Sequence, residues 1–221
     1  MQTFDTPAPI SAILDIPAGR VQFVAADRVD TTVEVLPADP AKSRDVKVAE
    51  QTTVVYGDGV LRIEATAKHQ ILGSSGSIQV TVGLPAGSRV EVKAASADVR
   101  AVGRLGDVAY DGAHGDINLD DVTGVRLTTL AGDVSVGRLN GPAQISTAKG
   151  DIRIVEAVRG AVVLHTQAGD VSVGAAAGVD ASLDAGTSYG RVHNALKNAG
   201  GTAELTIHAT TAYGDIAARS L

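Results

Sequence analysis

Apolar and polar residues alternate with a period of two along most of the chain. At Ile152, Arg153 and Ile154, for example, the apolar residues share one parity and the charged residue has the other. Successive side chains of a strand point to opposite faces, so this alternation predicts strands with one buried and one exposed face. The helical period of 3.6 fits only a short turn at Asn194–Asn198.

The strand patterns after about residue 90 recur as a repeat. One set begins at Asp98, Asp116, Asp133, Asp151, Asp170, Arg191 and Asp215, in steps of 18, 17, 18, 19, 21 and 24 residues. A second set lies between them and begins at Asp107, Val125, Ala143, Val162, Ala181 and Glu204. Two strands in each repeat of about 18 residues are typical of the coil of a β-solenoid.

The signature Thr-x-x-Gly-Asp, or a variant of it, marks one corner of each coil. The residues that we assign to these corners are Gly115, Asp116, Thr129, Gly132, Asp133, Thr147, Gly150, Asp151, Thr166, Gly169, Asp170, Thr187, Gly190, Thr211, Gly214 and Asp215. Glycine accepts a positive φ at a corner, and aspartate bonds nearby backbone N–H groups. The threonine shares the parity of the apolar residues, so it is expected to point inward and to bond a buried corner group. We interpret the signature as structural.

Residues 1–90 alternate in the same way but lack the repeat. We therefore expect an N-terminal β-rich capping region at 1–90, made of antiparallel pairs, and solenoid repeats at 91–221. The sequence Tyr56–Val60 is a hairpin-turn signal between two alternating runs. Ala38–Asp45 is expected to be a polar loop and Lys68–Ser77 a flexible one.

A column of calcium sites is the alternative interpretation of the corner aspartates. Stacked coils would bring successive carboxylates to a spacing of roughly 5 Å, where like charges recruit a cation. However, calcium prefers six to eight oxygen ligands, and each corner offers one carboxylate. Arg191 also interrupts the column, and His165 and His208, on the same outward face two coils apart, are the one pair that could share a zinc ion. We expect no metal and no cofactor.

Composition and charge exclude several classes of protein. The net charge is −6 without a basic stripe, and aromatic residues make up 3% of the chain, which argues against nucleic-acid binding. The absence of cysteine excludes disulfides and thiol chemistry. The sequence shows neither a signal peptide nor an apolar stretch long enough for membrane insertion, so it predicts a cytoplasmic protein unless a leader precedes it.

The chain resembles a bacterial putative-adhesin family, a family of unknown function with β-strand repeats. The resemblance lies in Leu84–Val102 ("LPAGSRVEVKAASADVRAV"), in the early "DIPAGRVQF" strand and in the repeated T-x-x-G-D-[VI] units. It implies an all-β fold, a right-handed single-stranded β-solenoid, and brings no catalytic residues. The family label suggests a role at the cell surface.

The function expected from the sequence is a non-catalytic scaffold or protein-interaction module. The chain stops just after its last strand, so we expect an open C-terminal edge that meets a second copy or another protein, unless Asn194–Gly201 folds over it. A cell-surface adhesin or glycan-binding protein is the alternative, for which Tyr110, Tyr189 and Tyr213 are the candidate aromatic residues. Tyr189 and Tyr213 each precede a corner glycine, so we expect them to stack on one another. A polysaccharide-acting enzyme is the weaker third reading, because short corners leave little room for a converging site.

Overall fold

The computed structural model describes residues 1–65, 76–198 and 202–221. The chain divides into two compact units, Met1–Gly115 and Asp116–Leu221. Most of the expected flexible loop Lys68–Ser77 lies outside the described residues.

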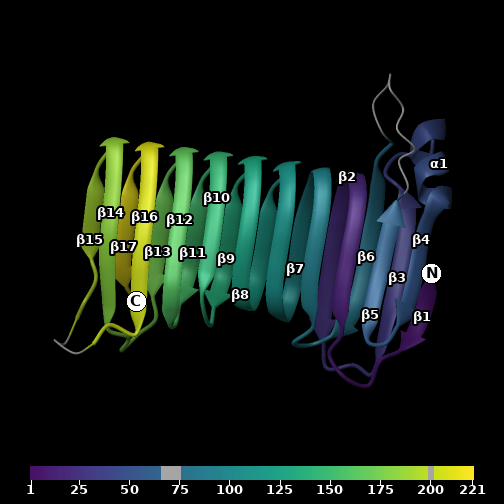
Figure 1. Ribbon diagram of the computed structural model, residues 1–221, viewed down its shortest axis with the longest axis horizontal. Coiled ribbons are helices and arrows are strands. Elements are labelled where there is room, and N and C mark those ends of the chain that lie inside the picture. The colour runs from purple at the N-terminus through teal and green to yellow at the C-terminus, as the bar shows by residue number, and fades with distance from the viewer. Residues whose placement is uncertain (66–75, 199–201) are drawn as a thin grey trace. The chain divides into compact units, whose positions relative to one another are not determined.

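Over its described residues, 1–65 and 76–115, the N-terminal unit contains seven strands and one helix (Figure 1). They are β1 (Gln2–Asp5), β2 (Ser11–Ala26), β3 (Asp30–Pro37), α1 (Ser43–Gln51), β4 (Thr52–Gly57), β5 (Val60–Ala65), β6 (Ile78–Pro85) and β7 (Arg89–His114). Asp58 and Gly59, with φ of 51° and 74°, form the turn between β4 and β5, as the hairpin signal predicts.

Strand β2 is parallel to its neighbours, contrary to the expectation of antiparallel pairs alone. Its first half pairs with β5 and β7, and its second half pairs with β6 and β7. The coil formed by β2 therefore lies between the coil of β5 and β6 and the first coil of β7. The antiparallel pairs are β1–β3, β3–β6 and β4–β5. Solenoid pairing thus begins at residue 11, before the repeat is visible in the sequence.

Helix α1 occupies part of the segment expected to be a polar loop and was not predicted. Its sequence, SRDVKVAEQ, carries too few apolar residues for a clear helical stripe. The buried Asp45 carboxylate fixes the helix in place, because its Oδ1 accepts a hydrogen bond of 3.0 Å from the backbone N–H of Ser77. The short turn expected at Asn194–Asn198 is a strand end followed by irregular chain.

The C-terminal unit consists of strands that pair in parallel. They are β8 (Ile117–Ala131), β9 (Val134–Leu139), β10 (Ala143–Lys149), β11 (Ile152–Ala157), β12 (Gly160–Ala168), β13 (Val171–Ala175), β14 (Ala181–Tyr189), β15 (Val192–Ala195), β16 (Leu205–Tyr213) and β17 (Ile216–Ser220). One ladder joins β8, β10, β12, β16 and β14. The other joins β8, β9, β11, β13, β17 and β15.

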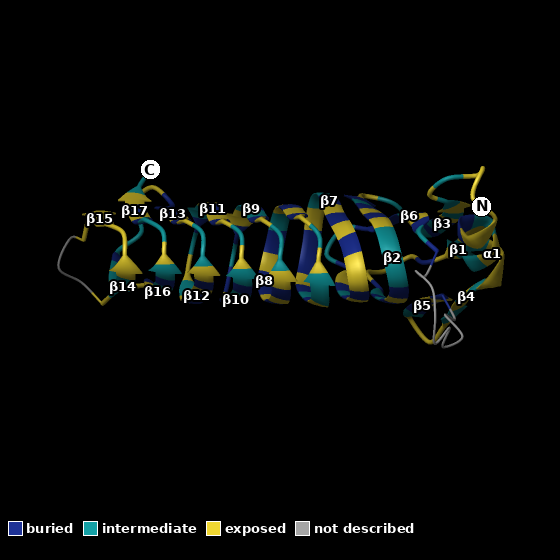
Figure 2. Ribbon diagram, turned by 90° about the horizontal axis from the view of Figure 1, so that it is seen from above, coloured by how far each residue is buried: buried dark blue, intermediate teal, exposed yellow. Residues whose placement is uncertain are grey.

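The core of each unit is made of columns of aliphatic side chains on the inner faces of the ladders. Leu127, Ile145 and Leu164 occupy matching register positions on neighbouring strands and are buried. Buried and exposed residues alternate along the strands in Figure 2, as the period of two predicts. The predicted β-solenoid fold is confirmed.

Candidate functional site

The last coil in the sequence is not the last coil in space. Strand β16 pairs with β12 on one side and β14 on the other, and β17 pairs with β13 and β15. Figure 1 shows the yellow β16 between the green β12 and β14. The expected open C-terminal edge at Asp215–Leu221 is therefore wrong, because both strands of that coil are paired on both sides.

The outermost coil is instead formed by β14 and β15, and we call it the terminal coil. Within the described part of the chain, β14 pairs with β16 alone and β15 with β17 alone. Residues Asn194–Asn198 run beside the end of β17, where the backbone N–H of Lys197 donates to Ser220 Oγ at 2.8 Å. The remaining residues of the segment expected to fold over the edge, 199–201, lie outside the described residues.

The corner aspartates form a hydrogen-bonded column that follows the spatial order of the coils. Oδ1 of each aspartate accepts a hydrogen bond from the backbone N–H at the same corner of the next coil. The bonds run from Asp133 to Asp116 (3.0 Å), Asp151 to Asp133 (2.9 Å), Asp170 to Asp151 (2.8 Å), Asp215 to Asp170 (2.7 Å) and Arg191 to Asp215 (2.9 Å). Each carboxylate thus satisfies a backbone donor of its neighbour, which is a structural use of the aspartate.

Glycine and threonine complete each corner. Gly150 has a φ of 141°, and a Cβ there would overlap the carbonyl oxygen of Gly132 in the neighbouring coil. The threonines point inward and donate to corner carbonyl oxygens, for example Thr166 to Gly150 at 3.1 Å and Thr211 to Gly169 at 3.0 Å. Thr129, Thr147, Thr166 and Thr211 are buried, and Thr187 in the terminal coil is half-buried.

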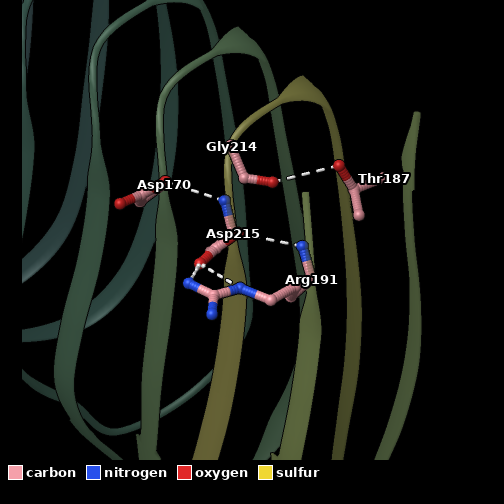
Figure 3. A network of polar contacts seen from close by, with 5 residues as sticks. All are labelled: Asp170, Thr187, Arg191, Gly214 and Asp215. Atoms are coloured by element: carbon pink, nitrogen blue, oxygen red, sulfur yellow. Dashed lines mark hydrogen bonds and ion pairs between the residues drawn. The ribbon is translucent and has the colours of Figure 1, made fainter. Parts of the chain in front are cut away.

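Arg191 is the last residue of the corner column and forms an ion pair with Asp215 (Figure 3). Its guanidinium Nη2 lies 2.7 Å from Oδ2 of Asp215, and its Nε lies 3.2 Å from the same oxygen. The hydrogen bonds from the side chain and then the backbone of Arg191 hold the pKa of Asp215 below its ordinary value, and the Asp215 carboxylate raises the pKa of Arg191. Arginine has no acceptor oxygen, so this corner offers none to a further coil.

The terminal coil is less completely buried than the coils behind it. Leu205, Ile207 and Ala209 of β16 are fully buried, whereas Leu183 and Ala185 of β14 are half-buried. All four residues of β15 are exposed. The inner side of the terminal coil therefore has no covering layer among the described residues, and its small side chains limit the apolar surface that is left in water.

Two tyrosines stack on one another at the corner of the last two coils. The rings of Tyr189 and Tyr213 are 4.9 Å apart between centroids and inclined by 4°. They remain 68% and 61% exposed, although they are large apolar groups. Tyr110, the third aromatic candidate, is buried, and burial raises the pKa of its hydroxyl. The predicted stacking is confirmed, and the exposure of the stacked rings was not foreseen.

The histidine pair lies on neighbouring strands but is offset. His165 is opposite Thr210 and bonds its hydroxyl at 2.8 Å, while His208 is opposite Val163 and contacts Asp184 at 3.0 Å. They are one coil apart, not two. In residues 1–65, 76–198 and 202–221, no group of three or more histidine or acidic side chains is arranged to hold a metal ion.

An open groove of about 660 Å³ in the N-terminal unit was not predicted. Asp15 lies in register between Glu64 and Lys93, and Asp111 also lines the groove. The groove could not be predicted from the sequence, because its lining residues come from β2, β5 and β7, which are far apart along the chain. Lys93 lies 3.3 Å from Glu91, so the charges in this region are mixed.

None of the helices in the described part of the chain is long and apolar enough to cross a membrane. Among the curated proteins, none matches this chain.

One solved structure shares the fold at low sequence identity. A structure described as a putative adhesin from Bacteroides fragilis is similar to this chain with a TM-score of 0.61 and 14% identity, over 98% of this chain and 95% of that chain. A putative cell adhesion protein from Clostridium sporogenes aligns over 100% of this chain and 98% of that chain, with a TM-score of 0.40 and 9% identity.

The sequence profile of one family, Toastrack DUF4097, matches residues 14–220, which is nearly the whole chain. This span includes most of β2, the corner column and the terminal coil. The chain therefore belongs to the Toastrack DUF4097 family.

Proposed function

We propose that this protein is a non-catalytic interaction module that binds other proteins through its terminal coil. The observation that carries this proposal is that β14 and β15 are each hydrogen-bonded on one side only within the described residues. An edge strand presents a row of backbone N–H and C=O groups that can pair with a strand of another chain. Charged side chains beside such an edge would select the partner.

The corner residues support a structural role for the rest of the repeat. The corner aspartates accept hydrogen bonds from backbone N–H groups of neighbouring coils, and the corner threonines donate to backbone carbonyl oxygens. Repetition of one corner in every coil builds a rigid stack that holds the terminal coil in place. The name putative adhesin, given to the similar structure from Bacteroides fragilis, is compatible with an interaction role.

A blocked edge tests this proposal. Leu183→Lys introduces an inward-pointing charge on β14, a substitution that discourages strand pairing at an edge while its long side chain reaches water through the open end. Val163→Lys is the matched control, because it adds the same charge on the outward face of the interior strand β12. Proteins captured from an extract of the source cells by the wild type and by Val163→Lys should be lost with Leu183→Lys. Equal capture by all three would contradict the proposal.

Glycan binding at the cell surface is a second candidate, favoured by the stacked and exposed Tyr189 and Tyr213. Aromatic ring faces pack against the apolar faces of sugars, and the outer ring belongs to the terminal coil. Binding to a glycan array that disappears in Tyr189→Ala but persists in Tyr56→Ala would support this reading. Detection of the protein only inside intact cells, with no glycan bound on the array, would exclude it.

A further inference from the structure

The two edges of the terminal coil carry opposite charges. On the side of β14 lie Asp180, Asp184 and Glu204, and the Asp184 side chain is 81% exposed. On the side of β15 lie Arg191, Lys197 and Arg219, and the Arg191 side chain is 88% exposed. Asp180 lies beside Glu204 because its carbonyl oxygen accepts the Glu204 backbone N–H at 2.9 Å, and Arg219 is in register with Ala195 of β15. Asp215 is ion-paired with Arg191 on the β15 side, so the net positive charge there comes from Lys197 and Arg219. The coil thus has an acidic edge and a basic edge.

A twofold axis parallel to the strands makes this surface complementary to itself. Rotation by 180° about such an axis places β14 of one copy beside β15 of the other. The two strands run in opposite directions within one coil, so the new pairs are antiparallel. The acidic edge then meets the basic edge twice, whereas pairing of β14 with β14 would bring like charges together.

The corner column disfavours an open-ended stack of coils. Another parallel coil placed on the terminal coil would bring its corner N–H above Arg191, where no side-chain oxygen is present to accept it. Inside the unit, each such N–H meets an aspartate. The terminal coil therefore fits a closed antiparallel contact better than a filament.

We propose that the partner of the terminal coil is a second copy of this chain, docked about a twofold axis with β14 of each copy against β15 of the other. This inference rests on the proposed function and names its partner. The register that sets Tyr189 opposite the partner's Val192 places Asp184 opposite the partner's Lys197, with both side chains on the outward face.

The size of the coil sets the strength expected of the contact. Strand β14 has nine residues and is about 30 Å long, and a coil with its outward side chains is about 20 Å thick. The end therefore covers about 600 Å² per copy, or about 1,200 Å² in total, which is near the lower limit of specific interfaces. We expect a weak dimer, with a dissociation constant in the micromolar range, that salt weakens further.

Sedimentation velocity tests the dimer directly. The mass of the wild type should rise from 22.4 kDa toward twice that value between about 1 µM and about 500 µM protein, a range that spans the affinity of small interfaces. The rise should be smaller at high salt. A mass that stays at 22.4 kDa throughout, or that grows beyond a dimer, would overturn the inference.

A charge swap identifies the surface. Asp184→Lys and Lys197→Glu each replace two attractive pairs with two repulsive ones, so each should weaken association by about tenfold or more. The double variant restores opposite charges and should recover association. Arg153→Glu, on the outward face of the interior strand β11, is the control and should associate like the wild type. Failure of the double variant to recover, with thermal melts showing that it folds, would count against this docking.

The two proposals fail separately. If the wild type is monomeric and Leu183→Lys still abolishes the capture of other proteins, the second copy is not the partner, but the proposed interaction module stands. If the wild type is monomeric and Leu183→Lys captures the same proteins as the wild type, both proposals are wrong.

Discussion

The outermost coils of the two units end in different ways. In the N-terminal unit, the coil of β5 and β6 is followed by the antiparallel strands β4 and β3, and α1 packs against β3, β5 and β6. Leu61, Ile63 and Ile78 of that coil are consequently fully buried. In the C-terminal unit, the terminal coil has no such cover among the described residues, and Leu183 stays half-buried.

This difference shows two ways to end a β-solenoid. The N-terminal unit retains large aliphatic side chains to its last coil and covers them with additional chain. The C-terminal unit reduces the size of its inward side chains, because the register position that holds Leu127, Ile145 and Leu164 holds Ala209 and Ala185 in the last two coils. It also places a charged Arg191 at the corner. The second solution leaves backbone groups available, and this is the surface that we assign to a partner.

The largest predicted effect tests whether the corners of the two units are equivalent. Gly150→Ala and Gly19→Ala should each destabilise the protein by about 3 kcal/mol or more or prevent folding, because both glycines have positive φ and a Cβ would overlap a backbone carbonyl of the next coil. Gly57→Ala is the control, since its Cβ would meet no described atom within 4 Å. Denaturant unfolding measures the three variants. A mild effect at either corner would show that the corners differ.

The second prediction tests how much the chain that covers the outermost N-terminal coil contributes to the burial of that coil's core. Leu61→Ala should cost about 3 kcal/mol because it leaves a cavity in a closed core, whereas Leu183→Ala should cost about 1 kcal/mol because its site is already partly hydrated. Unfolding at low protein concentration keeps self-association out of the comparison. Equal losses for the two leucines would mean that the terminal coil is covered as well as the N-terminal one.

The smallest effect concerns one exposed ion pair in each unit. Hydrogen bonds from the side chain of Arg28 lower the pKa of Asp30, as those from Arg191 lower the pKa of Asp215. A carboxyl group with a lowered pKa stabilises the fold above its unfolded pKa of about 3.9, and this contribution is lost as the pH falls through the folded value. Asp30→Asn and Asp215→Asn should therefore each lose less stability than the wild type between pH 7 and about pH 3. Both effects should be small because the groups are exposed.

An unchanged acid transition in Asp215→Asn would show that the ionised form of Asp215 contributes nothing to stability at the end of the corner column. A changed acid transition in Asp30→Asn but not in Asp215→Asn would show that only the N-terminal unit gains stability from its exposed ion pair.

The sequence allowed the coils and their corners to be predicted because both depend on local chemistry. The period of two assigns Ile152 and Ile154 to the core without further information, and a corner with glycine next to aspartate has few backbone solutions. The stacking of Tyr189 on Tyr213 could be predicted for the same reason, since both precede the corner glycine.

The order of the coils could not be predicted from the repeat. The coil of β16 and β17 carries the same Thr-x-x-Gly-Asp corner as the coil of β12 and β13, and this corner does not by itself indicate which coil lies next to it. Arg191 is the residue from which the position of the terminal coil could have been predicted. A coil without a corner carboxylate cannot accept the N–H of a following coil, so it belongs at an end. The strongly apolar Ile207 and Ile216, by contrast, favour an interior position.

Local alternation and corner chemistry thus fixed which residues face inward and where the chain turns, because each depends on neighbours within a few residues. Which coil lies outermost depended on contacts between segments far apart along the chain, such as Asp215 with Asp170, which are 45 residues apart. Similar repeats make those pairings hard to distinguish along the sequence, whereas the packed structure buries Leu205, Ile207 and Ile216 in an interior coil and leaves Arg191 at the end.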